Sequence, residues 1–138
     1  MPTPANPPAF VARRTVEFAE TDMAGIVHFS NFFRWMEAAE NAFVRQLGGA
    51  VVEQVAGGFR GWPRVRAHAK YQAPARLGDA VAVELRVEAV KDRSVAYAFV
   101  IWVEGTERVK AATGGLTIAY VEKRSEEHTS ELQSRMFI

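Results

Sequence analysis

The sequence contains no cysteine, and this absence excludes several kinds of site. Without a thiol, the chain cannot form a disulfide framework, use a thiolate nucleophile or bind a metal through sulfur. Histidine is also scarce, with 3 residues in a chain of 138. His28 and His68 do not have the spacing of metal ligands, and His128 lies in the polar C-terminal segment. We therefore expect no metal centre.

The sequence also lacks an excess of charge and a long apolar run. Its 17 Lys and Arg residues are interleaved with 16 Asp and Glu residues, which leaves a net charge of +1. A domain that binds nucleic acid usually has a basic face, so we expect no such partner. The apolar runs are far shorter than the ~20 residues of a membrane-spanning helix. The proline-rich start lacks the apolar segment of a signal peptide, and we expect a cytoplasmic protein with no membrane partner.

The length of the chain suits one domain. Apolar residues make up 49% of the sequence and charged residues 24%, which is typical of a soluble globular protein. We predict a disordered N-terminal arm over residues 1–9 and a folded domain over residues 10–123. In residues 124–138, charged and polar residues replace the apolar alternation, and the segment resembles a translated sequencing adaptor. We predict that this tail is not native to the domain.

One long amphipathic helix is predicted after residue 29. Apolar residues recur there at spacings of three and four, which places them on one face of about five helical turns. We expect Ser30 to cap the helix and Gly48 with Gly49 to end it. The predicted apolar face consists of Phe32, Phe33, Met36, Ala39, Phe43, Val44 and Leu47.

The remaining segments favour strands. The first strand is predicted over residues 10–18, with Phe10, Ala12, Val16 and Phe18 on one face. Four further strands, separated by turn residues, are predicted over residues 64–72, 80–90, 94–104 and 108–122. One strand, one helix and four successive strands indicate an α+β fold in which an antiparallel sheet buries the helix.

The loop before the helix carries an acid, Asp22, among mostly apolar neighbours. One interpretation is structural, because Asp commonly stabilises turns and helix starts. The other is catalytic, since Gly25 permits close approach of a ligand and the first helical amides lack intrahelical partners. A carboxylate beside such donors is a minimal site for acyl transfer. The residues alone leave both interpretations open.

The segment around Asp22 resembles the opening of hotdog-fold acyl-CoA thioesterases of the 4-hydroxybenzoyl-CoA thioesterase type. The shared pattern is a strand ending in acid-x-Asp, then Gly-Ile-Val, then an aromatic-rich helix with Trp-x-Glu, here spread over residues 16–48. The resemblance continues to about Val121. It implies a hotdog fold, in which an antiparallel β-sheet wraps around one long central α-helix.

The same resemblance implies an activity: hydrolysis of an acyl-CoA thioester to a carboxylic acid and free coenzyme A. Asp22 matches the catalytic acid, which acts as nucleophile or general base, and the backbone amide of Phe29 matches the group that polarises the thioester carbonyl. His28 stands where family members commonly carry Tyr or Trp. Glu37 matches a helix carboxylate that helps to shape the acyl pocket.

Further residues are assigned by the resemblance to the carrier. Lys91 and Arg93 match a basic turn that binds the phosphates of coenzyme A, although Asp92 interrupts it. The implied partner is an acyl thioester of coenzyme A or of acyl carrier protein. No cofactor is implied, because coenzyme A is part of the substrate. The expected assembly is a homodimer with a continuous sheet, or a homotetramer, with active sites built from two chains.

Two alternative functions remain open at this point. Hotdog-fold hydratases of enoyl and 3-hydroxyacyl thioesters resemble the pattern D-x-N-P-[Leu/Ile/Val]-H, whereas five residues and no Asn-Pro separate Asp22 from His28 here. A non-catalytic acyl-thioester-binding module would use Asp22 only to cap the turn. The sequence favours the thioesterase.

Overall fold

The computed structural model describes residues 6–124 of the chain. One α-helix, α1 (Ser30–Gln46), and one 3₁₀-helix, η1 (Phe18–Glu20), are the helical elements of this part of the chain. The strands follow one another as β1 (Phe10–Thr15), β2 (Val52–Val55), β3 (Gly58–Gly61), β4 (Arg64–Tyr71), β5 (Ala80–Val90), β6 (Ser94–Glu104), β7 (Val109–Ala119) and β8 (Val121–Arg124).

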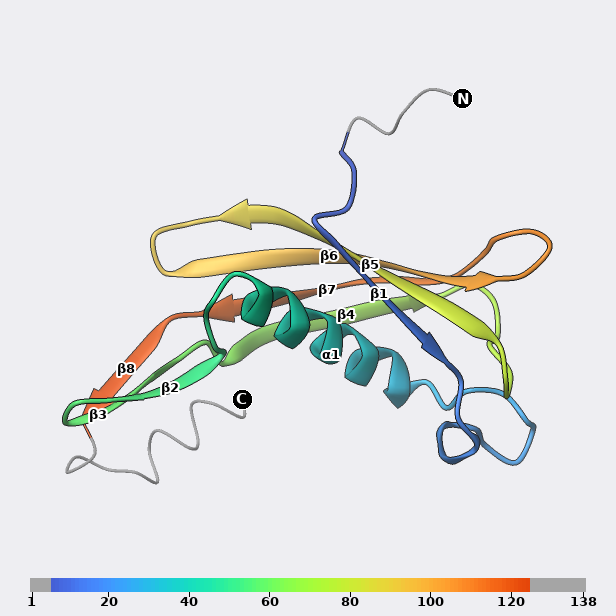
Figure 1. The fold of residues 1–138 in the computed structure, drawn as a ribbon, viewed down its shortest axis with the longest axis horizontal. Coiled ribbons are helices and arrows are strands. Elements are labelled where there is room, and N and C mark those ends of the chain that lie inside the picture. Colours follow the sequence, from blue (N-terminus) through green and yellow to red (C-terminus); the bar gives the residue numbers. More distant parts are fainter. Residues whose placement is uncertain (1–5, 125–138) are drawn as a thin grey trace.

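Five strands form one antiparallel sheet in the order β1-β5-β6-β7-β4, and α1 lies along one face of this sheet (Figure 1). The three other strands form a small antiparallel sheet in the order β2-β3-β8, beyond the C-terminal end of α1. The fold is therefore α+β, with one central helix held in an antiparallel sheet. This is the hotdog fold that the sequence predicts.

The helix lies close to the sheet because the strand beneath it carries a glycine. A Cβ atom on Gly114 of β7 would lie 2.5 Å from Cε of Met36 and 2.6 Å from the carbonyl oxygen of His68. A larger residue would push α1 or β4 away from β7. The apolar side chains that share this core include Phe32, Trp35, Met36 and Ala39 of α1, with Val83, Leu85, Phe99, Ile101, Leu116 and Ile118 of the sheet.

One charged side chain, Glu40 of α1, lies inside this core and is 0% exposed. Its carboxylate accepts a hydrogen bond from the Arg64 guanidinium through Oε1, while Oε2 has no hydrogen-bond partner among the described residues. Burial raises the pKa of Glu40, with the Arg64 charge opposing the shift and the Glu37 charge adding to it. Burial, together with the Glu40 charge, also raises the pKa of Tyr97 to about 12.

The predicted helix is confirmed, but one detail of the predicted first strand and two details at the helix borders are wrong. Phe18 is 79% exposed, because β1 ends at Thr15 and Phe18 begins η1 instead of continuing the strand. Phe29 occupies the N-cap position, and Ser30 is the first helical residue, so Ser30 does not cap the helix. Leu47 is 70% exposed, because the helix ends at Gln46.

The predicted glycine stop signal at the C-terminal end of the helix is confirmed. Gly48 adopts φ 86°, which glycine tolerates, and the Gly49 amide donates to the Val44 carbonyl.

The main strands are also confirmed, whereas the small sheet was not predicted. β2 and β3 have four residues each and show little apolar alternation, and β3 begins and ends with glycine. The last predicted strand, over residues 108–122, is interrupted at Tyr120, so β7 stays in the large sheet and β8 joins the small one. β2 and β3 form a short local hairpin with weak alternation, and β8 joins it through pairing with the distant β3, so no local pattern indicated the sheet.

The predicted domain limits are only partly covered by the described residues. Within the predicted arm, the Asn6 carbonyl accepts a hydrogen bond from Arg86 Nε at 2.8 Å, and the Ala9 amide donates to the Leu85 carbonyl at 2.8 Å. Arg124, the first residue of the predicted tail, is the last residue of β8. Residues 1–5 and 125–138 lie outside the described part of the chain. No helix within residues 6–124 is long and apolar enough to cross a membrane.

Candidate active site

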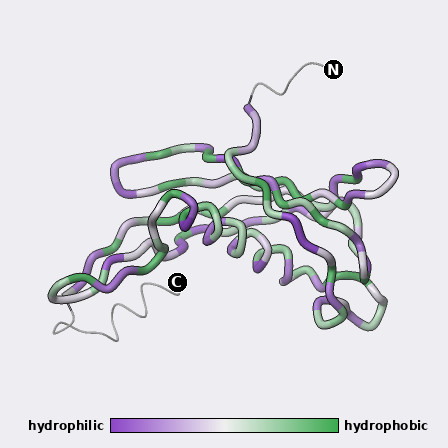
Figure 2. The backbone as a smooth tube through the Cα atoms, viewed as in Figure 1, coloured by the Kyte–Doolittle hydropathy of each residue, from purple (hydrophilic) through white to green (hydrophobic). Residues whose placement is uncertain are grey.

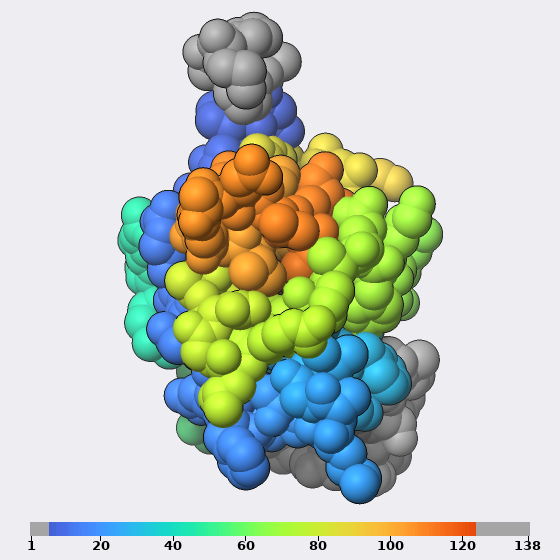
Figure 3. All heavy atoms as spheres, turned by 90° about the vertical axis from the view of Figure 1, so that its right-hand side faces the viewer, coloured from blue at the N-terminus to red at the C-terminus, as the bar shows by residue number. Residues whose placement is uncertain are grey.

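The loop between β1 and α1 is closed by its own main chain. The Asp22 amide donates to the Ile26 carbonyl at 2.8 Å, and Thr21 and Val27 form an isolated antiparallel bridge. Gly25 makes the turn with φ 80°, a value that residues with a side chain rarely adopt. The Val27 amide donates to the Ala75 carbonyl at 2.8 Å, which ties the loop to the segment between β4 and β5. Figure 3 shows this end of the molecule, where the loop (blue) lies directly below that segment (yellow-green).

The carboxylate of Asp22 uses one oxygen to stabilise this turn. Its Oδ1 accepts hydrogen bonds from the amides of Ala24, at 2.8 Å, and Ile26, at 3.3 Å. Its Oδ2 receives no hydrogen bond from residues 6–124, and the side chain is exposed. The structural and catalytic interpretations are therefore compatible. One oxygen orients the carboxylate, and the other is accessible to a ligand.

Asp22 opens onto a pocket of ≈ 500 Å³ at the N-terminal end of α1. The polar groups of the pocket come from the loop and from the end of β4, while aromatic rings form much of its wall. A pocket of this size accommodates an organic acyl group. The lining residues are Asp22, Ile26, Val27, His28, Phe29, Phe32, Tyr71, Gln72, Ala73 and Pro74.

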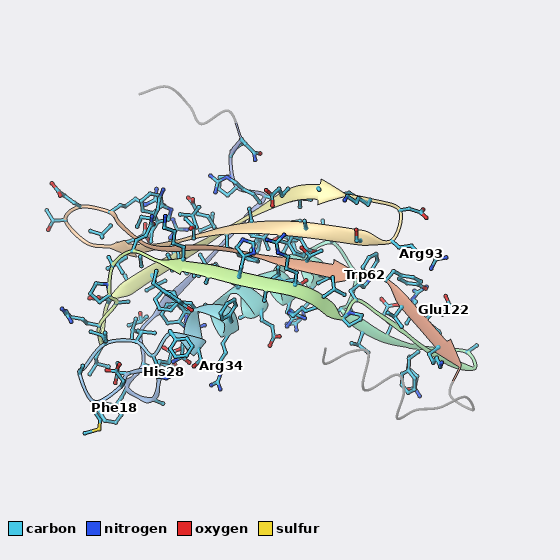
Figure 4. The ribbon with its side chains drawn as sticks, turned by 180° about the vertical axis from the view of Figure 1, so that it is seen from behind. Phe18, His28, Arg34, Trp62, Arg93 and Glu122 are labelled. Atoms are coloured by element: carbon cyan, nitrogen blue, oxygen red, sulfur yellow. The ribbon has the colours of Figure 1, made fainter. Side chains whose placement is uncertain are left out.

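The imidazole of His28 is fixed by the first residue of α1. Its Nδ1 lies 2.8 Å from Ser30 Oγ and accepts a hydrogen bond from the Ser30 amide at 3.3 Å. Because an amide can only donate, Nδ1 is the acceptor, and the neutral ring carries its proton on Nε2. The ring also packs against Phe29, with centroids 4.5 Å apart. His28 therefore presents an N–H donor from a held ring; Figure 4 marks its position at the loop.

The backbone amide of Phe29 is free at the start of α1. Phe29 is the N-cap residue, and its amide donates no hydrogen bond within the described chain. Amides at this position lie at the positive end of the helix dipole, where they stabilise negative charge. The Phe29 carbonyl, by contrast, accepts hydrogen bonds from the Tyr71 hydroxyl and the Phe32 amide. The residue is thus held through its carbonyl while its amide stays available to a ligand.

Three aromatic rings pack against one another beside these groups. Tyr71 meets Phe32 edge-on at a centroid distance of 5.3 Å and Phe29 edge-on at 6.3 Å. Phe32 in turn contacts Trp35 at 5.1 Å. Burial raises the pKa of Tyr71 above its ordinary value, and its hydroxyl donates to the Phe29 carbonyl. The pocket thus combines a free carboxylate oxygen, a free amide and an aromatic wall.

The family of the chain follows from its sequence pattern as well as from this geometry. The pattern of the Thioesterase superfamily matches residues 24–110, which is more than half of the chain. The chain belongs to the Thioesterase superfamily. The match begins two residues after Asp22, so it does not itself test the assignment of that residue.

Similar proteins support the membership in this superfamily. A protein of Aquifex aeolicus is 32% identical over 104 residues, covering 75% of this chain and 80% of that protein. The 1,4-dihydroxy-2-naphthoyl-CoA hydrolase of Prochlorococcus marinus is 34% identical over 89 residues, covering 59% of each. The structure of a gentisyl-coenzyme A thioesterase superposes with a TM-score of 0.70 at 25% identity, covering 82% of this chain and 89% of that one. The named thioesterase-superfamily relatives are acyl-CoA thioester hydrolases, and the chain spans about three fifths of the Prochlorococcus enzyme.

The structure brings only some of the predicted thioesterase residues together. Asp22, His28 and Phe29 line one pocket. Glu37 does not line it; its carboxylate lies 3.5 Å from the Arg64 guanidinium on the exposed side of α1. Its predicted contribution to the acyl pocket stays a prediction.

The predicted phosphate-binding residues lie far from Asp22 in the single chain. Lys91 and Arg93 form the exposed tip of the β5–β6 hairpin, which is hydrophilic in Figure 2. Figure 4 shows Arg93 at one end of the sheet and His28 at the other. One chain alone therefore does not bring the hairpin and the Asp22 pocket together, and the assignment of Lys91 and Arg93 stays a prediction.

The sequence analysis missed the pocket residues that come from the end of β4 and the segment after it, and two of these carry polar groups. Tyr71 and Gln72 lie at the end of β4, more than forty residues from Asp22, and they reach the pocket only because β4 pairs with β7 along α1. The predicted strand over residues 64–72 contained both, but nothing local distinguished its last residues. Among residues 6–124, no group of three His, Asp or Glu side chains is placed to hold a metal ion.

Proposed function

We propose that the protein hydrolyses an acyl-CoA thioester, releasing a carboxylic acid and free coenzyme A. The observation that carries this proposal is that Asp22, which has a free carboxylate oxygen, and Phe29, which has a free backbone amide, line one pocket. Thioester hydrolysis needs these two functions: an oxygen or a base that attacks the carbonyl carbon, and a donor for the negative charge that develops on the carbonyl oxygen. A cytoplasmic location, expected from the sequence alone, stays a prediction.

The chemistry follows two routes that use the same residue. As a nucleophile, Asp22 Oδ2 attacks the thioester carbon, the C–S bond breaks, the thiolate leaves, and water hydrolyses the resulting anhydride. As a general base, Asp22 takes a proton from the water molecule that attacks the same carbon, and the C–S bond then breaks as the thiolate leaves. In both routes the Phe29 amide stabilises the oxyanion, and the amides of Ala24 and Ile26 hold the carboxylate in place through Oδ1.

The aromatic lining of this pocket favours an aromatic acyl group. The rings of Phe29, Phe32 and Tyr71 offer edges and faces to a planar acyl group. The named relatives act on 1,4-dihydroxy-2-naphthoyl-CoA and gentisyl-coenzyme A, which carry aromatic acyl groups. We propose the same class of substrate for this protein.

A second copy of the chain would complete the site. β4 is an edge strand of the large sheet, and most of its side chains are exposed. Such edges are normally covered or paired. Antiparallel pairing of two β4 strands would bring the Arg64 end of one strand to the Tyr71 end of the other. The hairpin with Lys91 and Arg93 lies at the Arg64 end of the sheet, because Arg64 and Ser94 pair with the neighbouring residues Ile118 and Ala119 of β7. Each hairpin would therefore approach the Asp22 pocket of the other chain. We propose this homodimer, with phosphates bound across the interface.

The activity is tested by assaying thiol release from benzoyl-CoA, 1,4-dihydroxy-2-naphthoyl-CoA and aliphatic acyl-CoAs, in parallel with hydration of crotonyl-CoA. We expect thiol release, fastest with the aromatic substrates, and no hydration. Hydration without thiol release would assign the protein to the hydratases. Binding without either reaction would assign it to the non-catalytic modules.

Mixing two variants tests the shared site. Asp22→Asn chains and Lys91→Ala/Arg93→Ala chains are each impaired, but a mixed dimer would contain one site with wild-type Asp22 and wild-type cations. After joint refolding, we expect about a quarter of the wild-type rate at substrate concentrations below KM, because about half of the dimers are mixed and each has one intact site. A rate no higher than the sum of the separate variants would contradict a site built from two chains.

A further inference from the structure

The base of the Asp22 loop is held by another acid, Glu20. Its Oε2 accepts hydrogen bonds from Trp35 Nε1 at 2.7 Å and from the Arg14 guanidinium at 2.9 Å. Its Oε1 accepts one from the Glu17 amide at 2.8 Å. These donors belong to α1, to β1 and to the residue that precedes η1. One carboxylate therefore joins the strand and the helix between which the Asp22 loop is suspended.

The main chain of Glu20 holds the far end of the same loop. Its carbonyl accepts hydrogen bonds from the His28 amide and from Asn31 Nδ2, both at 2.9 Å. Asn31 is buried, and its side chain also donates to the His28 carbonyl. The beginning and the end of the loop thus meet at Glu20, two residues before Asp22 and beside the residue that precedes Phe29.

The hydrogen bonds of the Glu20 side chain, which we call the Glu20 anchor, depend on its negative charge. The Glu20 side chain is 12% exposed. Burial alone would raise the pKa of Glu20, but the Glu17 amide, the Trp35 indole and the Arg14 guanidinium together hold it below its usual value. A glutamine would present an NH₂ group where the carboxylate meets only donors, so at least one of these hydrogen bonds would be lost.

We propose that Glu20 is a positioning residue: it sets the Asp22 carboxylate and the Phe29 amide at the separation that thioester hydrolysis requires, without touching the substrate. This inference rests on the proposed function. It follows from the geometry because a carboxylate misplaced by about 1 Å can lose on the order of a hundredfold in rate. The capping of Asp22 Oδ1 fixes the turn internally, whereas Glu20 fixes the whole loop relative to α1.

The chain supplies a matched control in Glu84 of β5. Its carboxylate accepts hydrogen bonds from Trp102 Nε1 at 3.0 Å, from Arg86 at 3.1 Å and from Arg108 at 3.1 Å. Its side chain is 13% exposed, and the same types of donor hold its pKa below the usual value against the effect of burial. Both clusters also place an arginine over the indole ring. Glu84 does not line the Asp22 pocket, so it reproduces the chemistry of the Glu20 cluster without its location.

The test compares Glu20→Gln with Glu84→Gln in the full chain, using kcat, KM and the melting temperature. We expect both substitutions to lower the melting temperature, since each leaves arginine side chains without a carboxylate. Only Glu20→Gln should lower kcat, by about tenfold or more, with KM within about twofold of wild type. Trp35→Phe, which removes the indole donor and keeps an aromatic ring, should lower kcat in the same direction, while Trp102→Phe should not. If Glu20→Gln does not fold, the comparison of Trp35→Phe with Trp102→Phe tests the inference instead.

Two further measurements separate positioning from a general loss of stability. In an Asp22→Asn background, adding Glu20→Gln should change the residual rate by less than about twofold, because Glu20 acts through Asp22. Amide exchange of residues 21–29 should be faster in Glu20→Gln and unchanged in Glu84→Gln. Equal kcat losses at Glu20 and Glu84, or unaltered kcat in Glu20→Gln, would overturn the inference. An inactive wild-type protein would overturn the proposed function instead, and the exchange measurement would still test the anchor.

Discussion

Two carboxylates near α1, Asp22 and Glu40, each have one oxygen without a hydrogen-bond partner among the described residues, yet they differ in what can reach them. Asp22 lies in an exposed loop at the N-terminal end of the helix, where water satisfies the free oxygen and a substrate can replace that water. Glu40 is 0% exposed and is paired with Arg64 inside the core. A free carboxylate oxygen is therefore not sufficient to define a site; access and the neighbouring donors decide.

The same contrast applies to the two ends of the helix. At the N-terminal end, the Phe29 amide is unpaired and the Phe29 side chain is 59% exposed, so groups that could stabilise the fold remain available to a ligand. At the C-terminal end, the Leu47, Gly48 and Gly49 amides all donate to carbonyls of the last turn. Functional sites often sacrifice local stability in this way, whereas structural ends satisfy their polar groups.

Removing the charge of Asp22 should have the largest effect on activity. Asp22→Asn keeps the size of the side chain and a capping oxygen, but it removes the nucleophilic or basic oxygen. We expect kcat to fall by at least ~10²-fold, the low end for loss of a general base, with the melting temperature little changed. Steady-state kinetics and thermal unfolding measure both quantities. A variant that keeps most of its rate would reduce Asp22 to a turn residue.

Removing the partner of Glu40 should affect stability. Arg64→Met leaves a buried carboxylate without its cation and should lower the free energy of unfolding by about 2 kcal/mol. This is less than the ~3–5 kcal/mol for a fully buried pair, because Arg64 is 25% exposed. Denaturant titration measures the change.

The free energy of unfolding that Arg64→Met loses should depend on pH, with a defined sign. The folded-state pKa of Glu40 is raised above its ordinary value of 4.5, so the folded chain keeps this proton where the unfolded chain has lost it. The contribution of Glu40 is therefore fully present below pH ~4.5 and is lost as the pH rises. Without Arg64 the pKa rises further, so the variant should be weakened more at pH 8 than at pH 5. An equal loss at the two values would contradict the burial argument.

The hairpin cations should affect binding more than turnover. Lys91→Ala/Arg93→Ala removes two exposed charges from the predicted phosphate site, and phosphates bind equally in the ground state and the transition state. We expect a several-fold higher KM for acyl-CoA, a smaller change in kcat, and an effect that shrinks as salt is added. Saturation kinetics at low and high ionic strength provide the measurement. If KM at low salt is unchanged, the hairpin is an ordinary solvated turn.

The imidazole of His28 should have the smallest effect. It lines the pocket, is held by Ser30 and packs against the Phe29 ring, but it makes no hydrogen bond to Asp22. We expect His28→Ala to lower kcat by less than ~10-fold, below the usual contribution of a general acid or base. The kinetics of Asp22→Asn, measured under the same conditions, provide the reference. A loss as large as that of Asp22→Asn would make His28 part of the chemistry.

The sequence by itself determined the elements whose pattern is local. The three-and-four spacing of apolar residues indicated α1, glycine indicated its end, and alternation indicated the long strands β4 to β7, because each of these patterns depends on near neighbours. The motif around Asp22 indicated the loop and its family. These predictions agree with the structure because periodic burial and turn chemistry act within a few residues.

Only the tertiary structure decided which distant residues meet. The register of β4 against β7 brings Tyr71 to the Asp22 pocket, and the direction of β5 and β6 places Lys91 and Arg93 at the opposite end of the sheet. The burial of Glu40, the anchoring of the loop by Glu20, and the pairing of β3 with β8 likewise depend on packing between distant segments. No local pattern specifies such contacts, because they form only after the strands have paired and the helix has settled on the sheet.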